Sequence, residues 1–226
     1  MNKKQIEAKK LVDKDQYSLD EALVLLPKIS TSKFAGSIEM TINLKLNEKQ
    51  KKEPVRGSIT FPNAFGEQIR VLALVEKGDE ETAKKAGADF VGLEEYVKKI
   101  EKENWMDFDI VITTPKVMPQ IAKLGKYIGR KGLMPNPKNQ TVTTELEKVI
   151  KQYKQGKKDY KKDDSDTIRI ILGKTDMGAD QVKANFEEFK KAIKPHFEKL
   201  GPDSIKNVFL APTMGPSLKI AVGELK

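Results

Sequence analysis

Hydrophobic and polar residues alternate strictly along residues 37–46. The apolar members are Ile38, Met40, Ile42, Leu44 and Leu46, and the polar members are Ser37, Glu39, Thr41, Asn43 and Lys45. This period of two predicts a β-strand with one buried face and one polar, accessible face. A second strand is predicted near residues 55–61, and the basic turn at residues 49–52 between the two strands favours an antiparallel pair.

The middle of the chain has a different pattern. The run from Ile69 to Val75, apolar except at Arg70, is typical of a strand buried on both faces of a parallel sheet. Short strands are predicted at residues 89–91 and 108–113. Helical stretches are predicted at residues 80–86, 93–102, 116–124 and 144–153. This alternation of strands and helices predicts a small Rossmann-like βαβ unit.

The two ends of the chain share a third pattern, in which helices with one apolar face accompany isolated strands. A capping box from Ser18 to Glu21 predicts a helix that ends near Leu26, ahead of Pro27. Strands are predicted at residues 167–172, 208–210 and 218–222, and a charged tract at residues 157–166 precedes the first of them. An apolar stripe in the intervening helix comprises Val182, Phe186, Phe189 and Ile193. Pro195 is expected to kink or end that helix.

These patterns predict a two-domain protein of mixed α/β and α+β class. A discontinuous, sandwich-like α+β domain would consist of residues 1–65 and 156–226, and a Rossmann-like βαβ domain of residues 66–155 would be inserted into it. Residues 66–155 contain 16 Lys or Arg and 14 Asp or Glu, which leaves +7 of the net +9 for the terminal segments. This excess, with a pI near 9.4, favours an anionic partner such as nucleic acid or an acidic membrane surface.

Composition excludes several kinds of chemistry. The absence of cysteine excludes disulfides, thiolate metal sites and a cysteine nucleophile. His196 is the single histidine, expected at the surface or at a helix end, so a histidine-based triad or multi-histidine metal site is also excluded. No glycine-rich fingerprint follows a predicted strand, which argues against a bound dinucleotide. We expect no cofactor and no metal.

No membrane or export signal is recognisable. The longest purely apolar run, Val71 to Val75, is far shorter than the roughly 20 residues of a membrane helix. The basic start is not followed by the apolar run of a secretory signal. A soluble cytoplasmic protein is therefore expected.

One segment stands out for its charge. Residues 110–144 contain six Lys or Arg and no Asp or Glu. At its centre, residues 125–141 include three glycines that permit close turns, and Pro135 and Pro137, which stiffen the exit. The segment predicts a basic, exposed loop after the helix that ends at Leu124. On the residues alone, a solvated surface loop and an anion-facing loop remain equal alternatives.

Residues 132–143 of this segment resemble a known sequence signature. Gly-Leu-Met-Pro-Asn-Pro-Lys at residues 132–138, followed by Thr-Val-Thr at 141–143, closely resembles the signature of the L-one family of large-subunit ribosomal proteins. Ser-Lys-Phe at residues 32–34 and Thr-Met-Gly-Pro-Ser at 213–217 agree with it. The resemblance spans nearly the whole chain.

The resemblance implies a function. Members of this family look like two domains joined by a double hinge and bind ribosomal RNA in the mobile stalk beside the tRNA exit site. They aid release of deacylated tRNA and also repress translation of their own messenger RNA. The resemblance therefore implies a non-enzymatic protein that is a monomer within the ribosome. Its partners would be large-subunit ribosomal RNA, exit-site tRNA and its own messenger RNA, with no membrane partner.

The family also suggests which residues contact RNA. The resemblance implies RNA binding by Lys33, Phe34, Ser37, Glu39, Thr41, Arg169, Lys174, Asn207, Thr213, Met214, Gly215 and Pro216. Secondary contacts with RNA or tRNA are expected at Lys126, Arg130, Lys131 and Lys138. Asn207 departs from the family, in which serine is common at that position, and residues 211–212 are Ala-Pro where threonines are common.

Both proposed contact groups, at residues 33–34 and at residues 213–216, also have a purely structural interpretation. A threonine hydroxyl can reach a ribose 2′-OH, a methionine thioether can press on a ribose or base, and Gly215 would let the backbone come close to RNA. Without the resemblance, Phe34 could belong to the core and residues 213–216 could be a turn joining two strands. Two other functions also remain: a nucleotide-binding enzyme built on the middle domain, and a free-standing RNA chaperone.

Overall fold

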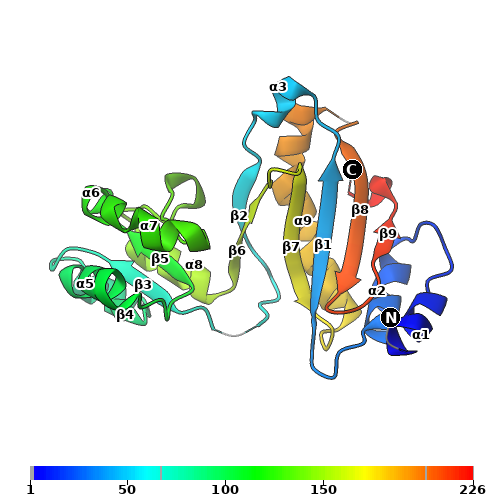
Figure 1. Cartoon of the computed structure of the whole chain (residues 1–226), viewed down its shortest axis with the longest axis horizontal. Coiled ribbons are helices and arrows are strands. Elements are labelled where there is room, and N and C mark those ends of the chain that lie inside the picture. Colours follow the sequence, from blue (N-terminus) through cyan, green and yellow to red (C-terminus); the bar gives the residue numbers. More distant parts are fainter. Residues whose placement is uncertain (1–2, 67, 202, 226) are drawn as a thin grey trace. The chain divides into compact units, whose positions relative to one another are not determined.

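The computed structural model describes residues 3–66, 68–201 and 203–225, except for the side chain of Lys138. The chain divides into two compact units (Figure 1). Unit 1 consists of Met1–Gly66 and Asp159–Lys226, and unit 2 of Glu67–Lys158. Both contain strands and helices, which confirms the mixed α/β fold class.

Unit 1 contains a four-stranded antiparallel sheet in the order β7-β1-β8-β9. The strands are β1 (Ser37–Leu44), β7 (Thr167–Lys174), β8 (Ile205–Pro212) and β9 (Leu218–Ile220). The alternation predicted for β1 is confirmed, because Ile38, Met40 and Ile42 are buried while the residues between them face outward. Strands from both ends of the chain therefore share one sheet.

Helices cover the apolar face of this sheet. Unit 1 contains α1 (Lys3–Lys10), α2 (Leu19–Ile29), α3 (Glu48–Lys51), α9 (Ala179–Leu200) and the 3-10 turn η4 (Val222–Glu224). In Figure 1, α9 lies behind the sheet, and side chains of α2 and α9 form one core with the buried residues of β1, β7 and β8. The opposite face carries the polar residues of β1.

Two prolines do not act as the sequence led us to expect. Helix α2 continues through Pro27 to Ile29, and α9 continues through Pro195 to Leu200. Proline removes one backbone hydrogen bond, yet Ile29 and Leu200 beyond it are buried in the core. Burial of these side chains holds the final turn in helical form. The predicted end at Leu26 is therefore wrong, and of the two alternatives at Pro195 the structure excludes a helix end.

The pairing expected between the first two strands is also wrong. Strand β2 (Arg56–Thr60) pairs with β6 (Lys157–Lys161) and not with β1. The charged tract at residues 157–166 therefore contains a strand. Tyr160 of β6 is buried and contacts the Phe189 ring edge-on, with ring centroids 5.4 Å apart.

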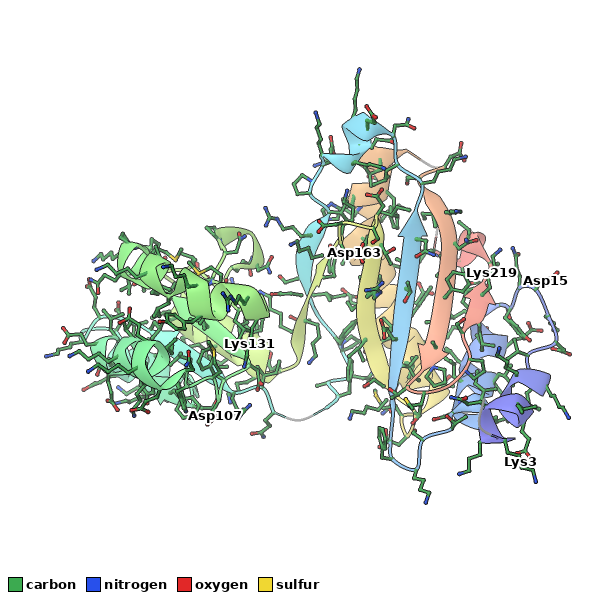
Figure 2. All side chains as sticks on the ribbon, viewed as in Figure 1. Lys3, Asp15, Asp107, Lys131, Asp163 and Lys219 are labelled. Carbon is green, nitrogen blue, oxygen red and sulfur yellow. The ribbon has the colours of Figure 1, made fainter. Side chains whose placement is uncertain are left out.

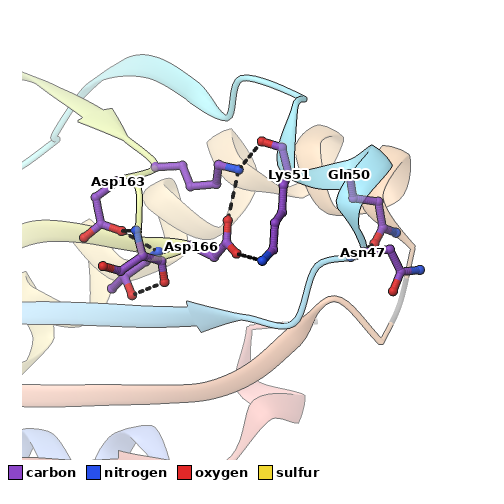
Figure 3. Close-up of polar contacts among 8 residues, drawn as sticks. Asn47, Gln50, Lys51, Asp163 and Asp166 are labelled. Carbon is purple, nitrogen blue, oxygen red and sulfur yellow. Dashed lines mark hydrogen bonds and ion pairs between the residues drawn. The ribbon is translucent and has the colours of Figure 1, made fainter.

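A turn after β6 closes the connection to β7 (Figure 3). The Asp163 carboxylate accepts a hydrogen bond from the backbone N–H of Thr167 at 2.8 Å. The Lys162 ammonium lies 3.2 Å from the Asp166 carboxylate and donates to the backbone carbonyl of Lys51 at 2.7 Å. The Asp166 carboxylate also lies 3.6 Å from the Lys51 ammonium. These contacts tie the turn to α3.

His196 lies in α9 and is half-buried, with its ring 6.0 Å from that of Tyr160. Burial lowers the pKa of His196 below its usual value of 6.5, and the positive charge of Lys199 lowers it further. A lowered folded-state pKa means that the unfolded chain binds the proton more readily. The neutral imidazole therefore favours the folded state above about pH 6.5, and this advantage is lost as the pH falls.

We expect the free energy of unfolding to decrease between pH 7 and pH 5 through His196, the single histidine. The prediction is checked by urea denaturation, followed by far-UV circular dichroism, of the protein and of His196→Asn at pH 5, 6 and 7. The substitution should flatten the pH dependence in this range. Equal pH dependence in the two proteins would contradict the assignment.

Unit 2 is built on a three-stranded parallel sheet in the order β4-β3-β5. Its strands are β3 (Val71–Leu74), β4 (Phe90–Val91) and β5 (Ile110–Thr113). Its helices are α4 (Glu80–Lys85), α5 (Glu94–Glu103), α6 (Met118–Ile121), α7 (Gly125–Ile128) and α8 (Leu146–Lys154), with 3-10 turns η1 (Ala122–Leu124), η2 (Gly129–Lys131) and η3 (Pro137–Asn139). Every residue of β3 is buried, as its apolar run predicted.

Helices cover both faces of this smaller sheet. Side chains of α4 and α8 form one core with Val71 and Ala73, and side chains of α5, α6 and α7 form the other with Leu72 and Leu74. A central parallel strand covered on both faces is the expected Rossmann-like arrangement. No helix in the described part of the chain has the length and apolar character required to span a membrane.

The acid-free segment is less of a loop than predicted. Helical turns continue from α6 through η2, and Gly125 and Gly129 have ordinary right-handed helical geometry. Leu124 and Ile128, four residues apart, are fully buried, and this spacing extends the helical turns beyond the predicted end at Leu124. Of the three glycines, only Gly132, with φ of 72°, takes the left-handed conformation, and it ends the helical run.

Candidate nucleic-acid interface

Two loops that are distant in the sequence are joined at one end of the unit 1 sheet. One connects α2 to β1 and contains Lys33 and Phe34, and the other connects β8 to β9. The Thr213 backbone N–H donates to the Ser37 carbonyl, and the Ser37 N–H donates to the Thr213 hydroxyl, both at 2.9 Å. The Thr31 hydroxyl donates to the Met214 carbonyl at 2.7 Å. These bonds bring the two sequence-predicted contact groups together.

The joined loops expose two large apolar side chains. Phe34 is 64% exposed and Met214 is 67% exposed. The alternative in which Phe34 belongs to the core is therefore wrong. Residues 213–216 do lie in a turn between strands β8 and β9, as the alternative without the resemblance held, but that turn projects Met214 into solvent.

Met214 is also conformationally unusual. Its φ of 65° lies in the left-handed region, which costs a non-glycine residue roughly 1–2 kcal/mol. Glycine would fit the backbone better, and the exposed side chain forms no part of a hydrophobic core cluster. Strain of this kind at an exposed residue is typical of functional sites.

Packing within the protein requires a glycine at position 215. A Cβ atom at this position would lie 2.6 Å from Cγ of Pro212 and 2.8 Å from the carbonyl oxygen of Ile29. A larger residue would therefore collide with the protein's own backbone and proline ring. Pro212, at one of the departures from the family pattern, is buried and closes this turn.

Other predicted contact residues lie on the polar face of the sheet, next to the joined loops. Ser37 lies opposite Lys174, Glu39 opposite Ile171 and Ala211, and Thr41 opposite Arg169 and Phe209. Opposed residues in antiparallel strands have Cβ atoms roughly 4.5–5.5 Å apart. Five of the predicted residues, Ser37, Glu39, Thr41, Arg169 and Lys174, therefore share one face of the sheet.

Asn207 lies at the other end of that face. It is opposite Asn43, six residues along β1 from Ser37, and a strand rises about 3.3 Å per residue. The separation from the joined loops is therefore roughly 20 Å along the strand. The structure does not bring Asn207 together with Met214 and Phe34.

Two residues that were missed in the sequence, Phe209 and Ile171, lie among the predicted ones. Phe209 is half-buried on the polar face, between Thr41 and Lys219, and Ile171 is 41% exposed beside Glu39. Val208 and Leu210, on either side of Phe209, are fully buried. Period-two alternation along β8 would have identified Phe209 as outward-facing.

This assortment of side chains suits RNA. Lys33, Lys174 and Arg169 can neutralise phosphates, although the Arg169 guanidinium also lies 3.6 Å from the Asp163 carboxylate. Glu39 can only accept hydrogen bonds when ionised, which fits a 2′-OH or a base amino group. The exposed Phe34 ring can stack on a base.

The expected secondary contacts lie in unit 2. Lys126 is on α7, and Arg130 and Lys131 are on η2; all three are exposed (Lys131 is labelled in Figure 2). None of the three forms an ion pair with a described carboxylate. The side chain of the fourth predicted residue, Lys138, lies outside the described residues.

A hollow of about 580 Å³ lies at the carboxyl ends of β3 and β4. This is where nucleotides bind in many open α/β sheets. Its lining comprises Val75, Glu76, Lys77, Glu80, Lys84, Val91, Gly92, Leu93, Glu94 and Glu95. Four carboxylates against two lysines create a negative environment that disfavours phosphate, so the hollow does not support the nucleotide-binding alternative.

Comparisons with known proteins agree with the resemblance. Residues 26–216 match the model of the Ribosomal protein L1p/L10e family. The chain is 42% identical over 217 residues to large ribosomal subunit protein uL1 of Mycoplasma genitalium, covering 95% of each chain. It is 39% identical over 226 residues to the uL1 protein of Mesoplasma florum, covering 98% of each chain, and 42% identical over 228 residues to that of Mycoplasma pneumoniae, covering 99%. The chain therefore belongs to the ribosomal protein L1p/L10e family.

Proposed function

We propose that this protein is a non-enzymatic structural component of the large ribosomal subunit and works on ribosomes in the cytoplasm. We further propose that unit 1 binds large-subunit ribosomal RNA of the mobile stalk beside the tRNA exit site. The relatives named above are large-subunit proteins that align with nearly the whole chain, which supports the first part.

One observation carries the RNA-binding part of the proposal. The two loops joined by the Thr213–Ser37 and Thr31–Met214 hydrogen bonds expose Phe34 and Met214 beside a polar sheet face. A rigid platform with exposed apolar side chains next to cations matches a folded RNA segment, whose riboses and unstacked bases offer apolar faces between phosphates.

Two finer roles follow from the same proposal. We assign aid in the release of deacylated tRNA to unit 2, where Lys126, Arg130 and Lys131 form an exposed basic group without a described acidic partner. We assign repression of the protein's own messenger RNA to the unit 1 surface, because a folded messenger segment of similar shape would meet the same loops.

The test measures binding to a stalk RNA fragment at several salt concentrations. Neutralisation of about five phosphates should give a log-log slope of affinity against salt near −4. A slope shallower than about −1 would remove the electrostatic part of the proposal. In a second arm, the native protein should sediment with large ribosomal subunits; RNA binding without such sedimentation would favour the free-standing chaperone.

A further inference from the structure

The N-terminal helix α1 was not expected from the sequence, and it lies beside the joined loops. Gln5 and Lys9 of α1 form one wall of a hollow of about 230 Å³, and Met214, Gly215 and Pro216 form the other. This volume is below the roughly 300–1,000 Å³ typical of small-molecule sites. The hollow is therefore better suited to one projecting group of a larger partner.

The face of α1 that lines the hollow is fixed by packing. Ala8 is buried in the unit 1 core, and Val12, four residues later, packs against the same core. Gln5 and Lys9 are also four residues apart, so they lie on an adjacent line of the helix. The chain after the helix is held by Tyr17, whose hydroxyl accepts hydrogen bonds from the backbone N–H groups of Asp13 and Lys14 at 2.9 and 3.0 Å.

The helix is strongly basic. Lys3, Lys4, Lys9 and Lys10 are exposed, and Glu7 is its single acidic residue (Lys3 is labelled in Figure 2). No described carboxylate lies within ion-pair distance of these four lysines. The exposed Met214 side chain and the Lys9 ammonium, which has no acidic partner among the described residues, thus border the same small hollow.

We propose that α1 is part of the RNA-binding surface, with Lys9 holding a backbone phosphate in the hollow beside Met214. This inference rests on the proposed RNA-binding function of unit 1. Met214 would meet a ribose or base, and Lys9 would neutralise the phosphate that follows it along the strand. The hollow therefore extends the contact surface from the two joined loops to a third segment of the chain.

The experiment compares Lys9→Glu with Lys10→Glu in the full-length protein. Both changes reverse one charge in the last turn of the same helix, so their effects on net charge and on the helix dipole are matched. Consecutive residues in a helix differ by about 100° in direction, so Lys10 points away from the line of Gln5 and Lys9. Affinity for a stalk RNA fragment is measured at several salt concentrations, with circular dichroism as the check on folding.

Lys9→Glu should lower the affinity about tenfold and make the salt slope shallower by about 1, whereas Lys10→Glu should lower the affinity less than about threefold. Met214→Asp provides the reference for the loop site. Equal affinity loss in the two lysine variants, with Met214→Asp still impaired, would overturn the role of α1 and leave the proposed function intact. Failure of the unchanged protein to bind the RNA would overturn both.

Discussion

Replacement of Met214 by Asp is expected to weaken binding of a stalk RNA fragment by about 2 kcal/mol or more, roughly thirtyfold, without lowering the thermal stability of the protein. Met214 is 67% exposed, and a carboxylate in its place would repel phosphate. The bonds that join the two loops use the Met214 backbone carbonyl and the side chains of Thr31 and Thr213. None uses the thioether, so the loops should keep their geometry.

A second variant separates the loss of the side chain from the gain of a charge. Met214→Gly removes the thioether and relieves the left-handed backbone, whose φ is 65°. It should melt at the same or a higher temperature than the unchanged protein and still bind RNA more weakly. Binding is measured by titration of labelled RNA, and stability by thermal denaturation.

The outcome distinguishes three interpretations of this turn. Weaker binding by both variants, with stability maintained, supports Met214 as a contact. Unchanged affinity at unchanged stability would show that the strained side chain has no role in binding. A large fall in melting temperature of Met214→Asp would show that the turn is part of the folding core, which its exposure argues against.

Elements with one clear periodicity were predictable. Strand β1 buries alternate residues, and β3 is buried throughout, because an apolar pattern of period two or an unbroken apolar run leaves few alternatives. Helix α2 begins at the predicted capping box, in which Glu21 N–H donates to the Ser18 hydroxyl at 3.3 Å. In each case the deciding interactions lie within a few residues of one another.

Elements that depend on distant partners were not predictable. Strand β6 begins with Lys157, which is only 4% exposed. Its ammonium donates to the side-chain oxygen of Gln140 at 2.8 Å and lies 5.0 Å from the centre of the Tyr153 ring. A lysine normally marks an exposed position, and only partners supplied by the folded chain make this burial tolerable. For this reason the sequence pattern indicated only a charged tract at residues 157–166, and strand β6 within it was not predicted.

The residues of the candidate site likewise fall into those that a sequence pattern predicts and those that depend on distant partners. Alternation along β1 pointed to the polar face with Ser37 and Thr41, and the same rule applied to β8 would have added Phe209. The exposure of Phe34 and Met214 follows from tertiary hydrogen bonds between segments more than 170 residues apart, such as that between Ser37 and Thr213 at a separation of 176. Sequence patterns cannot encode that contact. The basic helix α1 was missed because it buries only Ala8.

We propose that the two compact units are thermodynamically independent domains, as expected for residues 1–65 with 156–226 and for the inserted residues 66–155. Phe189 is fully buried in the unit 1 core, with its ring against Tyr160. The single tryptophan, Trp105, lies in unit 2, with its ring 4.8 Å from that of Phe90. Tryptophan fluorescence therefore reports unit 2, whereas far-UV circular dichroism reports both units.

Phe189→Ala is expected to destabilise unit 1 by about 3–5 kcal/mol, because it removes a fully buried ring and leaves a cavity between α9 and β6. The circular dichroism signal should gain a transition about 10 °C or more below the original one, while the midpoint of Trp105 fluorescence stays in place. Phe34→Ala is the matched control: the same substitution at a side chain that is 64% exposed should move neither signal. A Trp105 midpoint that falls together with the circular dichroism transition would show that the units unfold as one, and the proposed domain division would then be wrong.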